Sequence, residues 1–221
     1  MTARQVAEAT KNLAKSPTIL CLNPTSLGEV IDDIDRIGKN VVEEVRADKL
    51  VASLKGRIES VKKKVSLTTA RPRVACLEWL DPLIVAGHWV SEMVEVAGGL
   101  DCIGDKERAS FQVEWTELVE QRPEVIVVLP CGFTVQRGLA EMHLLTNRRE
   151  WNELSACQND RVFVTDSSSY FSRSGPRLVD GLEMLAEMIH PEIFSGMVPQ
   201  GAAVRMYGTA FRSQNGDDLT G

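Results

Sequence analysis

Aromatic, hydroxyl and cationic side chains stand close together in residues 166–177, DSSSYFSRSGPR. This stretch follows the apolar run RVFVT and precedes the amphipathic run LVDGLEMLAEMI, which predicts a loop between a strand and a helix. Tyr170 and Phe171 offer flat apolar surfaces, and Arg173 offers N–H donors with a permanent charge. These groups suit a flat, partly apolar ligand edged with amide carbonyls or phosphate. The plain alternative is a solvated turn in which Arg173 pairs with an acid of the same lobe.

A second group follows the predicted strand VACLEW, residues 74–79. Its candidate ligand-binding residues are Trp79, Asp81, Leu83, His88 and Trp89. Trp79 is either a ligand platform or a core aromatic, and Asp81 either contacts the ligand or caps the turn before Pro82. Leu83 offers apolar contact to a macrocycle. His88 either hydrogen-bonds an amide of the ligand or ligates a metal inside it, and a structural histidine is the alternative.

The third group is Cys131-Gly132-Phe133, directly after the apolar run EVIVVLP at 124–130. A glycine lets the backbone approach a ligand closely. Phe133 either stacks on the ligand or plugs the space beneath it, and Cys131 is either a contact or a small buried side chain.

These three groups need a scaffold that brings them together. Apolar runs and amphipathic segments alternate after residue 70, which predicts a mostly parallel sheet flanked by helices. The predicted strands are 74–79, 111–115, 124–130 and 161–165, and the predicted helices are 88–99, 115–121, 134–145, 149–154 and 176–189. In such α/β sheets ligands lie beyond the carboxyl ends of the strands, so we expect the three loops to share one pocket.

The N-terminal part has a different pattern. Residues 18–22, TILCL, predict a buried strand, and Ser26 with Glu29 predicts the start of a helix. Helical apolar spacing then continues for about forty residues, or about 60 Å of continuous helix. We interpret it as a spine joining two lobes; a coiled-coil arm, or two helices broken near Gly38, are the alternatives.

Composition excludes several classes of function. The 221-residue chain carries a net charge of −6, which argues against a nucleic-acid partner. No apolar run is long enough to span a bilayer. The start, MTARQVAEATKNLAKSP, lacks the apolar core of a secretion signal, so the chain as written is expected to be cytoplasmic or truncated. Its five cysteines form no metal-binding pattern, so we expect no metal site or cofactor of its own.

Four motifs together resemble a known family. LEWLDP, AGHWVSEMVEVAGG, VLPCGF and YFSRSGPRLVDGLE are similar, in this order, to the C-terminal lobe of cobalamin-binding proteins of the Fe/B12 periplasmic-binding family. LNPTSLGEVIDDIDRIG resembles the family's linker helix, and the likeness covers about residues 17–192. It implies a class III periplasmic-binding-protein-like lobe that binds a corrinoid, has no enzymatic activity and serves an ABC permease from the periplasm or the cell exterior. It places Arg173 at a ligand-contacting position and Ser169 where some relatives carry an acid.

The resemblance also predicts the domain organisation. Residues 1–26 are a remnant of an N-terminal lobe, 27–69 a long linker helix, 70–192 the ligand-binding lobe and 193–221 an irregular tail, disordered from 212. Family members clamp the corrinoid between two lobes, so we expect a chain with one lobe to bind it more weakly.

Other functions stay open at this stage. The same loops suit haem or an iron–siderophore chelate. Cys131 with His88 would suit a cytosolic thiol enzyme, although no nucleophile elbow surrounds the cysteine. An interaction module would use the acidic face of residues 29–48, which carries Glu29, Asp32, Asp33, Asp35, Glu43, Glu44 and Asp48.

Overall fold

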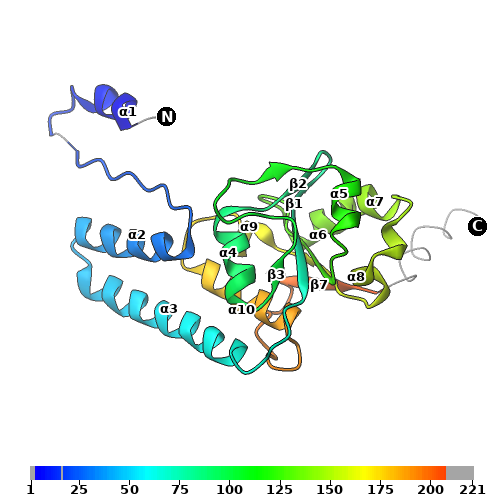
Figure 1. Ribbon diagram of the computed structural model, residues 1–221. Coiled ribbons are helices and arrows are strands. Elements are labelled where there is room, and N and C mark those ends of the chain that lie inside the picture. Colours follow the sequence, from blue (N-terminus) through cyan, green and yellow to red (C-terminus); the bar gives the residue numbers. More distant parts are fainter. Residues whose placement is uncertain (1–2, 16, 208–221) are drawn as a thin grey trace, which may run out of the picture.

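The computed structural model describes residues 3–15 and 17–207, which form an α/β lobe with a helical hairpin and an N-terminal segment beside it (Figure 1). The strands are β1 (Arg73–Leu80), β2 (Leu83–Val85), β3 (Leu100–Asp101), β4 (Phe111–Gln112), β5 (Val125–Val128), β6 (Val162–Thr165) and β7 (Ala203–Met206). The helices are α1 (Ala3–Thr10), α2 (Leu27–Asn40), α3 (Glu44–Val65), α4 (His88–Val96), α5 (Trp115–Glu120), α6 (Val135–Glu141), α7 (His143–Thr146), the 3-10 helix η1 (Trp151–Glu153), α8 (Ser155–Gln158), α9 (Ser167–Tyr170) and α10 (Arg177–Ile189).

The strands form a single mixed sheet in the order β4-β2-β1-β5-β6-β7, with β3 paired to β1. The centre is parallel, because β1 pairs with β5 and β5 with β6 in the same direction. The outer strands β2, β4 and β7 are antiparallel to their neighbours. The predicted α/β fold is therefore confirmed, with antiparallel strands added on both sides of the parallel core.

Helices cover both faces of the sheet, so the central strands are buried on each side. Successive residues of β1 belong to different cores: Val74 and Cys76 pack with α2, α3, α4 and α10, whereas Ala75 and Leu77 pack with the α5–α8 side. This is the alternation that a strand imposes on its side chains. Packing on both faces holds the carboxyl ends of the paired strands β1 and β5 rigidly next to each other.

The long helix predicted over residues 27–69 is not continuous, because the chain turns at residues 41–43 and α3 packs back against α2 (Figure 1). The alternative of two helices is the one observed. A Cβ on Gly38 would lie 2.2 Å from the Cβ of Ala47, so the glycine permits the close crossing. Both helices keep their apolar faces on the same core, and periodicity alone therefore cannot reveal the turn.

The predicted strand at residues 18–22 is also wrong. Residues 17–25 form an extended connection from α1 to α2, with Ile19 37% and Leu22 42% exposed (Figure 1). An apolar run becomes a strand only when another strand offers it hydrogen-bond partners, and none of the described strands pairs with this segment.

Three boundaries near the sheet edges also differ from the prediction. Residues 83–85 form β2 rather than part of a loop, and the strand predicted at 111–115 keeps only Phe111–Gln112. The tail predicted to be irregular contains β7, which pairs with β6 over residues 203–206. The predicted disorder at 212–221 lies outside the described residues.

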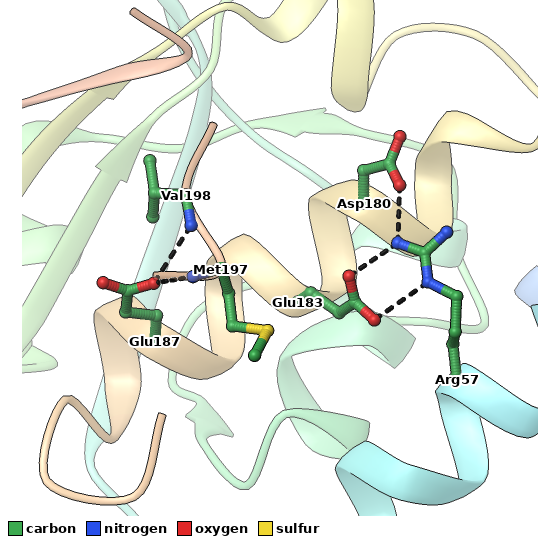
Figure 2. A network of polar contacts seen from close by, with 6 residues as sticks. All are labelled: Arg57, Asp180, Glu183, Glu187, Met197 and Val198. Atoms are coloured by element: carbon green, nitrogen blue, oxygen red, sulfur yellow. Dashed lines mark hydrogen bonds and ion pairs between the residues drawn. The ribbon is translucent and has the colours of Figure 1, made fainter. Parts of the chain in front are cut away.

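A network of charged groups joins the hairpin to the lobe (Figure 2). The Arg57 guanidinium in α3 donates to Glu183 and Asp180 of α10, with Nε 2.9 Å from Glu183 Oε1. These bonds raise the pKa of Arg57 further above its ordinary value. One turn further along α10, Glu187 accepts the backbone N–H groups of Met197 and Val198, which holds the following segment against the same helix.

Arg57→Ala is expected to lower the free energy of unfolding by about 1 kcal/mol, because it leaves two carboxylates side by side without their cation. Urea denaturation measures the change. Lys39→Ala is the matched control, since its single exposed ion pair with Asp35 lies within one helix and should contribute less to stability. Equal losses in the two variants would contradict a bridging role for Arg57.

Candidate functional site

The loops after β5 and β6 are joined by hydrogen bonds at the carboxyl edge of the sheet. Ser167 Oγ donates to the carbonyl of Pro130, and Ser168 N donates to the carbonyl of Phe133 at 3.1 Å. The Gly132 N–H donates to Ser172 Oγ at 3.0 Å. Serines of the 166–177 loop therefore position it against the loop at 130–133.

The end of β1 belongs to the same arrangement, since Cys131 N donates to the carbonyl of Glu78 at 3.2 Å. These elements surround a cavity of about 340 Å³. Its lining residues are Asn23, Pro24, Thr25, Glu78, Gly87, His88, Trp89, Val90, Ala109, Ser110, Leu129, Cys131, Phe171 and Ser172. Four of the predicted site residues, His88, Trp89, Cys131 and Phe171, thus line one cavity.

His88 begins α4 in an unusual backbone conformation, with φ of +49°. Its N–H donates to the Arg108 carbonyl at 2.9 Å. A Cβ on the preceding Gly87 would lie 2.2 Å from that same carbonyl, so the 105–110 loop packs tightly on this corner. Strained backbone of this kind gathers at binding sites, where the surrounding structure holds a side chain in one direction.

Trp89 is half-buried and joins α4 to the 166–177 loop, because its Nε1–H donates to the Phe171 carbonyl at 2.9 Å. Phe171 itself is 2% exposed and packs into the core. Its predicted exposure toward the ligand is therefore corrected: the residue borders the cavity, but its side chain packs into the core.

Leu83 and Phe133 were predicted to contact the ligand, but both are core residues. Leu83 is 6% exposed and packs in the core on the α5–α8 side of the sheet. Phe133 is 1% exposed, with its ring 5.3 Å from that of Trp79 and the Arg137 guanidinium 3.7 Å from its centre. Phe133 therefore plugs the edge, which was the alternative for this residue, and supports the half-buried Trp79.

The remaining predicted residues lie around the cavity rather than in its wall. Asp81 is exposed and accepts the Trp79 Nε1–H on its carbonyl at 3.1 Å. Gly132 has φ of +76°, which favours glycine, and Ser169 N donates to Asp166 Oδ1, which caps α9. Tyr170 is half-buried against the core.

Arg173 is exposed and makes no hydrogen bond or ion pair with any residue in 3–15 or 17–207. The alternative of a salt bridge within the lobe is thus not observed in the part of the chain that the structure describes. Arg173 directly follows Ser172, which lines the cavity, but Arg173 is not itself among the lining residues.

Sequence reasoning missed Glu78, Ser110 and residues 23–25. Glu78 lies inside the predicted strand, one residue before the segment inspected for binding groups. Ser110 reaches the cavity through the packing of the 105–110 loop, and residues 23–25 were predicted to follow a strand that does not form. A search that included the last residues of each strand would have found Glu78.

The five cysteines are free, and they differ sharply in exposure. Burial raises the pKa of Cys102 and of Cys157 to about 12, and it raises the pKa of the fully buried Cys76 thiol as well. At pH 8 these three are neutral thiols, whereas Cys21 and Cys131 are exposed.

Iodoacetamide at pH 8 is therefore expected to alkylate Cys21 and Cys131 well before the other three. Peptide mass spectrometry over a time course measures each site. At a pKa of about 12 the thiolate fraction of Cys102 and Cys157 at pH 8 is about one in ten thousand, and the Cys76 thiol is buried, so we expect all three to react far more slowly than Cys21 and Cys131. Early alkylation of Cys76 would contradict the packing described for β1.

Cys131 and His88 both line the cavity, and no hydrogen bond joins them among the described residues. In the same part of the chain, no group of three or more His, Cys, Asp or Glu side chains is placed to hold a metal ion.

None of the described helices is both long enough and apolar enough to cross a membrane.

The acidic face of residues 29–48 is partly neutralised by its own bases. Asp33 pairs with Arg36 and Asp35 with Lys39, each at 2.6 Å. Asp33 is also 8% exposed, so the surface offered to a basic partner is smaller than the sequence suggests.

The sheet, the hairpin and the loops at the carboxyl edge define a binding-protein lobe. The chain belongs to the family described as "Periplasmic binding protein", whose family model matches residues 1–169. This agrees with the family predicted from the four motifs.

Individual relatives agree with this assignment. The chain is 29% identical over 195 residues to the uncharacterized ABC transporter substrate-binding lipoprotein YvrC of Bacillus subtilis, a match that covers 85% of this chain and 59% of that protein. It is 32% identical over 103 residues to a vitamin B12-binding protein of Vibrio cholerae, over 46% of this chain and 34% of that protein. The matches thus span less than two thirds of the length of these relatives.

Solved structures show the same fold. The periplasmic heme-binding protein RhuT from Roseiflexus sp. RS-1 superposes with a TM-score of 0.70 at 20% identity, covering 86% of this chain and 72% of that one.

Proposed function

We propose that this chain is the ligand-binding component of an ABC uptake system and that its ligand is a corrinoid such as cobalamin. Family membership supports a binding role, and the relatives named vitamin B12-binding proteins support the corrinoid. The proposal includes a permease as partner, a location outside the cytoplasmic membrane, and no catalytic step. The metal of the ligand belongs to the ligand and needs no protein metal site.

One observation carries this proposal: loops from distant parts of the chain meet around a single cavity at the sheet edge. Its walls combine apolar side chains, such as Trp89 and Leu129, with hydroxyls of Ser110 and Ser172. A corrinoid has a flat apolar body with amide groups around its edge, so it matches both kinds of surface.

Haem is the second candidate, and Arg173 is the observation that favours it. An unpaired guanidinium at the rim would form a charge-assisted pair with a carboxylate of haem, whereas a corrinoid would offer it amide carbonyls or the nucleotide phosphate. An iron–siderophore chelate would use the same cation in the same way.

Titration with cyanocobalamin, haemin and a ferric hydroxamate siderophore tests the proposal. Visible absorption of the ligand and quenching of tryptophan fluorescence give each dissociation constant. We expect saturable binding of cyanocobalamin that is tighter than binding of the other two compounds. Binding of haemin alone would support the second candidate, and no binding of any of the three would overturn the proposal.

Arg173→Ala and Tyr170→Ala are expected to weaken cyanocobalamin binding about tenfold each, since each removes a rim contact worth about 1.4 kcal/mol. Arg177→Ala is the matched control, because it removes an exposed arginine from the first turn of α10 rather than from the segment next to the lining residues Phe171 and Ser172. Unchanged affinity in both rim variants would place the ligand elsewhere.

A further inference from the structure

Among the described residues that line the cavity, Glu78 is the one with a carboxylate. The residue lies near the carboxyl end of β1 and is half-buried. Its Oε2 accepts a hydrogen bond from Ser110 Oγ, which fixes the direction of the carboxylate. Within residues 3–15 and 17–207 no group donates to Oε1, and no lysine, arginine or histidine forms an ion pair with Glu78.

The surroundings of Glu78 do not compensate its charge. None of the described lining residues is an arginine or lysine, and His88 is the one titratable base among them. Much of the remaining wall is apolar, including Trp89, Leu129 and Phe171. When a ligand fills this cavity and displaces water, the free oxygen of Glu78 loses its solvent partners and needs a donor from the ligand.

Two kinds of ligand group behave oppositely at this position. An amide N–H of the ligand would donate to Oε1 and form a charge-assisted hydrogen bond. A ligand carboxylate would place two negative charges together in a site from which water has been removed, and it has no proton to donate. A site built around a buried hydrogen-bonding group rejects analogues that leave this group unpaired.

We propose that Glu78 is a specificity-determining residue that admits tetrapyrrole-like ligands bearing neutral carboxamides and rejects those bearing carboxylates at the same edge. The inference rests on the proposed function and deepens it, because it selects corrinoids with intact amides over haem. Ser110 is a positioning residue that directs the carboxylate. Arg173 is not among the residues that line the cavity, so it stands apart from the wall that contains Glu78.

The test compares two corrinoids that share the same ring and differ mainly in these groups. Dicyanocobinamide carries carboxamides, and dicyanocobyrinic acid carries carboxylates at the same positions of the same ring. Their dissociation constants are measured by absorption titration for the wild-type chain, for Glu78→Gln and for Glu120→Gln. The last variant makes the same change of charge on the exposed surface of α5, outside the cavity.

We expect the wild-type chain and Glu120→Gln to prefer the amide ligand at least about tenfold. Glu78→Gln replaces the anion by a group that both donates and accepts, so binding of the carboxylate ligand should tighten about tenfold while binding of the amide ligand changes little. Ser110→Ala should reduce the preference partly, because the carboxylate remains but loses its fixed direction.

The same preference in wild type and Glu78→Gln, with both proteins binding, would overturn the role of Glu78 and leave the proposed function intact. Absence of corrinoid binding in the wild-type chain would instead overturn the proposed function and, with it, this inference.

Discussion

Phe171→Ala will lower the free energy of unfolding by about 3–5 kcal/mol, the range for removing a large aromatic side chain from a core. The ring is 2% exposed and packs among the side chains that join α4 and α10 to the sheet. The lost volume cannot be refilled by the backbone, because the Phe171 carbonyl and N–H are already bonded to Trp89 and Ser167.

Urea denaturation measures the effect, and Tyr170→Ala is the neighbouring control. Tyr170 is half-buried, so its truncation removes less buried area and should destabilise the protein less. A loss below about 1 kcal/mol for Phe171→Ala would contradict its assignment to the core and return it to the ligand surface.

Gly181→Ala is expected to destabilise the protein by about 1–3 kcal/mol and to weaken ligand binding as well. A Cβ at this position of α10 would lie 2.4 Å from the Tyr170 carbonyl oxygen and 3.0 Å from the Phe171 ring. The first of these atoms belongs to the backbone, so relief of the clash must move either α10 or the binding loop.

Gly175→Ala provides the control for this prediction. A Cβ there meets nothing within 4 Å, so the variant should be neutral or slightly more stable, as expected when alanine replaces a glycine that needs no special conformation. Thermal unfolding and cyanocobalamin titration are measured on both variants. If Gly181→Ala behaves like Gly175→Ala, then the packing of α10 does not set the position of the 166–177 loop.

The sequence predicted the parts of the fold in which local pattern and tertiary structure agree. The runs at 74–79, 124–130 and 161–165 became β1, β5 and β6, and the amphipathic stretch at 176–189 became α10. In each case burial on both faces, or on one helical stripe, requires the observed spacing of apolar residues.

The failures occurred where the same pattern fits two structures. The apolar spacing of residues 27–65 continues through the turn at Val42, which has φ of +59°, because both helices face one core. The run TILCL has the composition of a strand but no described partner strand. Local residue types predict neither the reversal of the chain direction between α2 and α3 nor the lack of a partner strand for TILCL.

The prediction of the site was also right where the fold determines position and wrong where the same residue types fit two environments. Placing the loops at the carboxyl edge was correct, since parallel strands bring their ends together. Which aromatic side chains face the cavity was not predictable, because Phe133 and Phe171 have the same character as ligand-binding aromatics but are turned into the core by the hydrogen bonds of the loops. Glu78 was overlooked because it lies inside the predicted strand, before the segment that was inspected for binding groups.

Alkylation of Cys131 in the presence of cyanocobalamin tests the central claim most directly, because this exposed thiol lines the cavity. Cys21→Ser is the suitable background, since Cys21 lies two residues before the lining residue Asn23. The reference protein carries Cys21→Ser, Cys131→Ser and Glu120→Cys, so its exposed thiol lies on α5, away from the cavity.

We predict that saturating cyanocobalamin slows iodoacetamide alkylation of Cys131 at least about tenfold, since a ligand in the cavity excludes the reagent, and leaves the reference thiol unaffected. An unchanged rate at Cys131, under conditions where titration shows the ligand to be bound, would mean that the ligand does not occupy the cavity between the three loops.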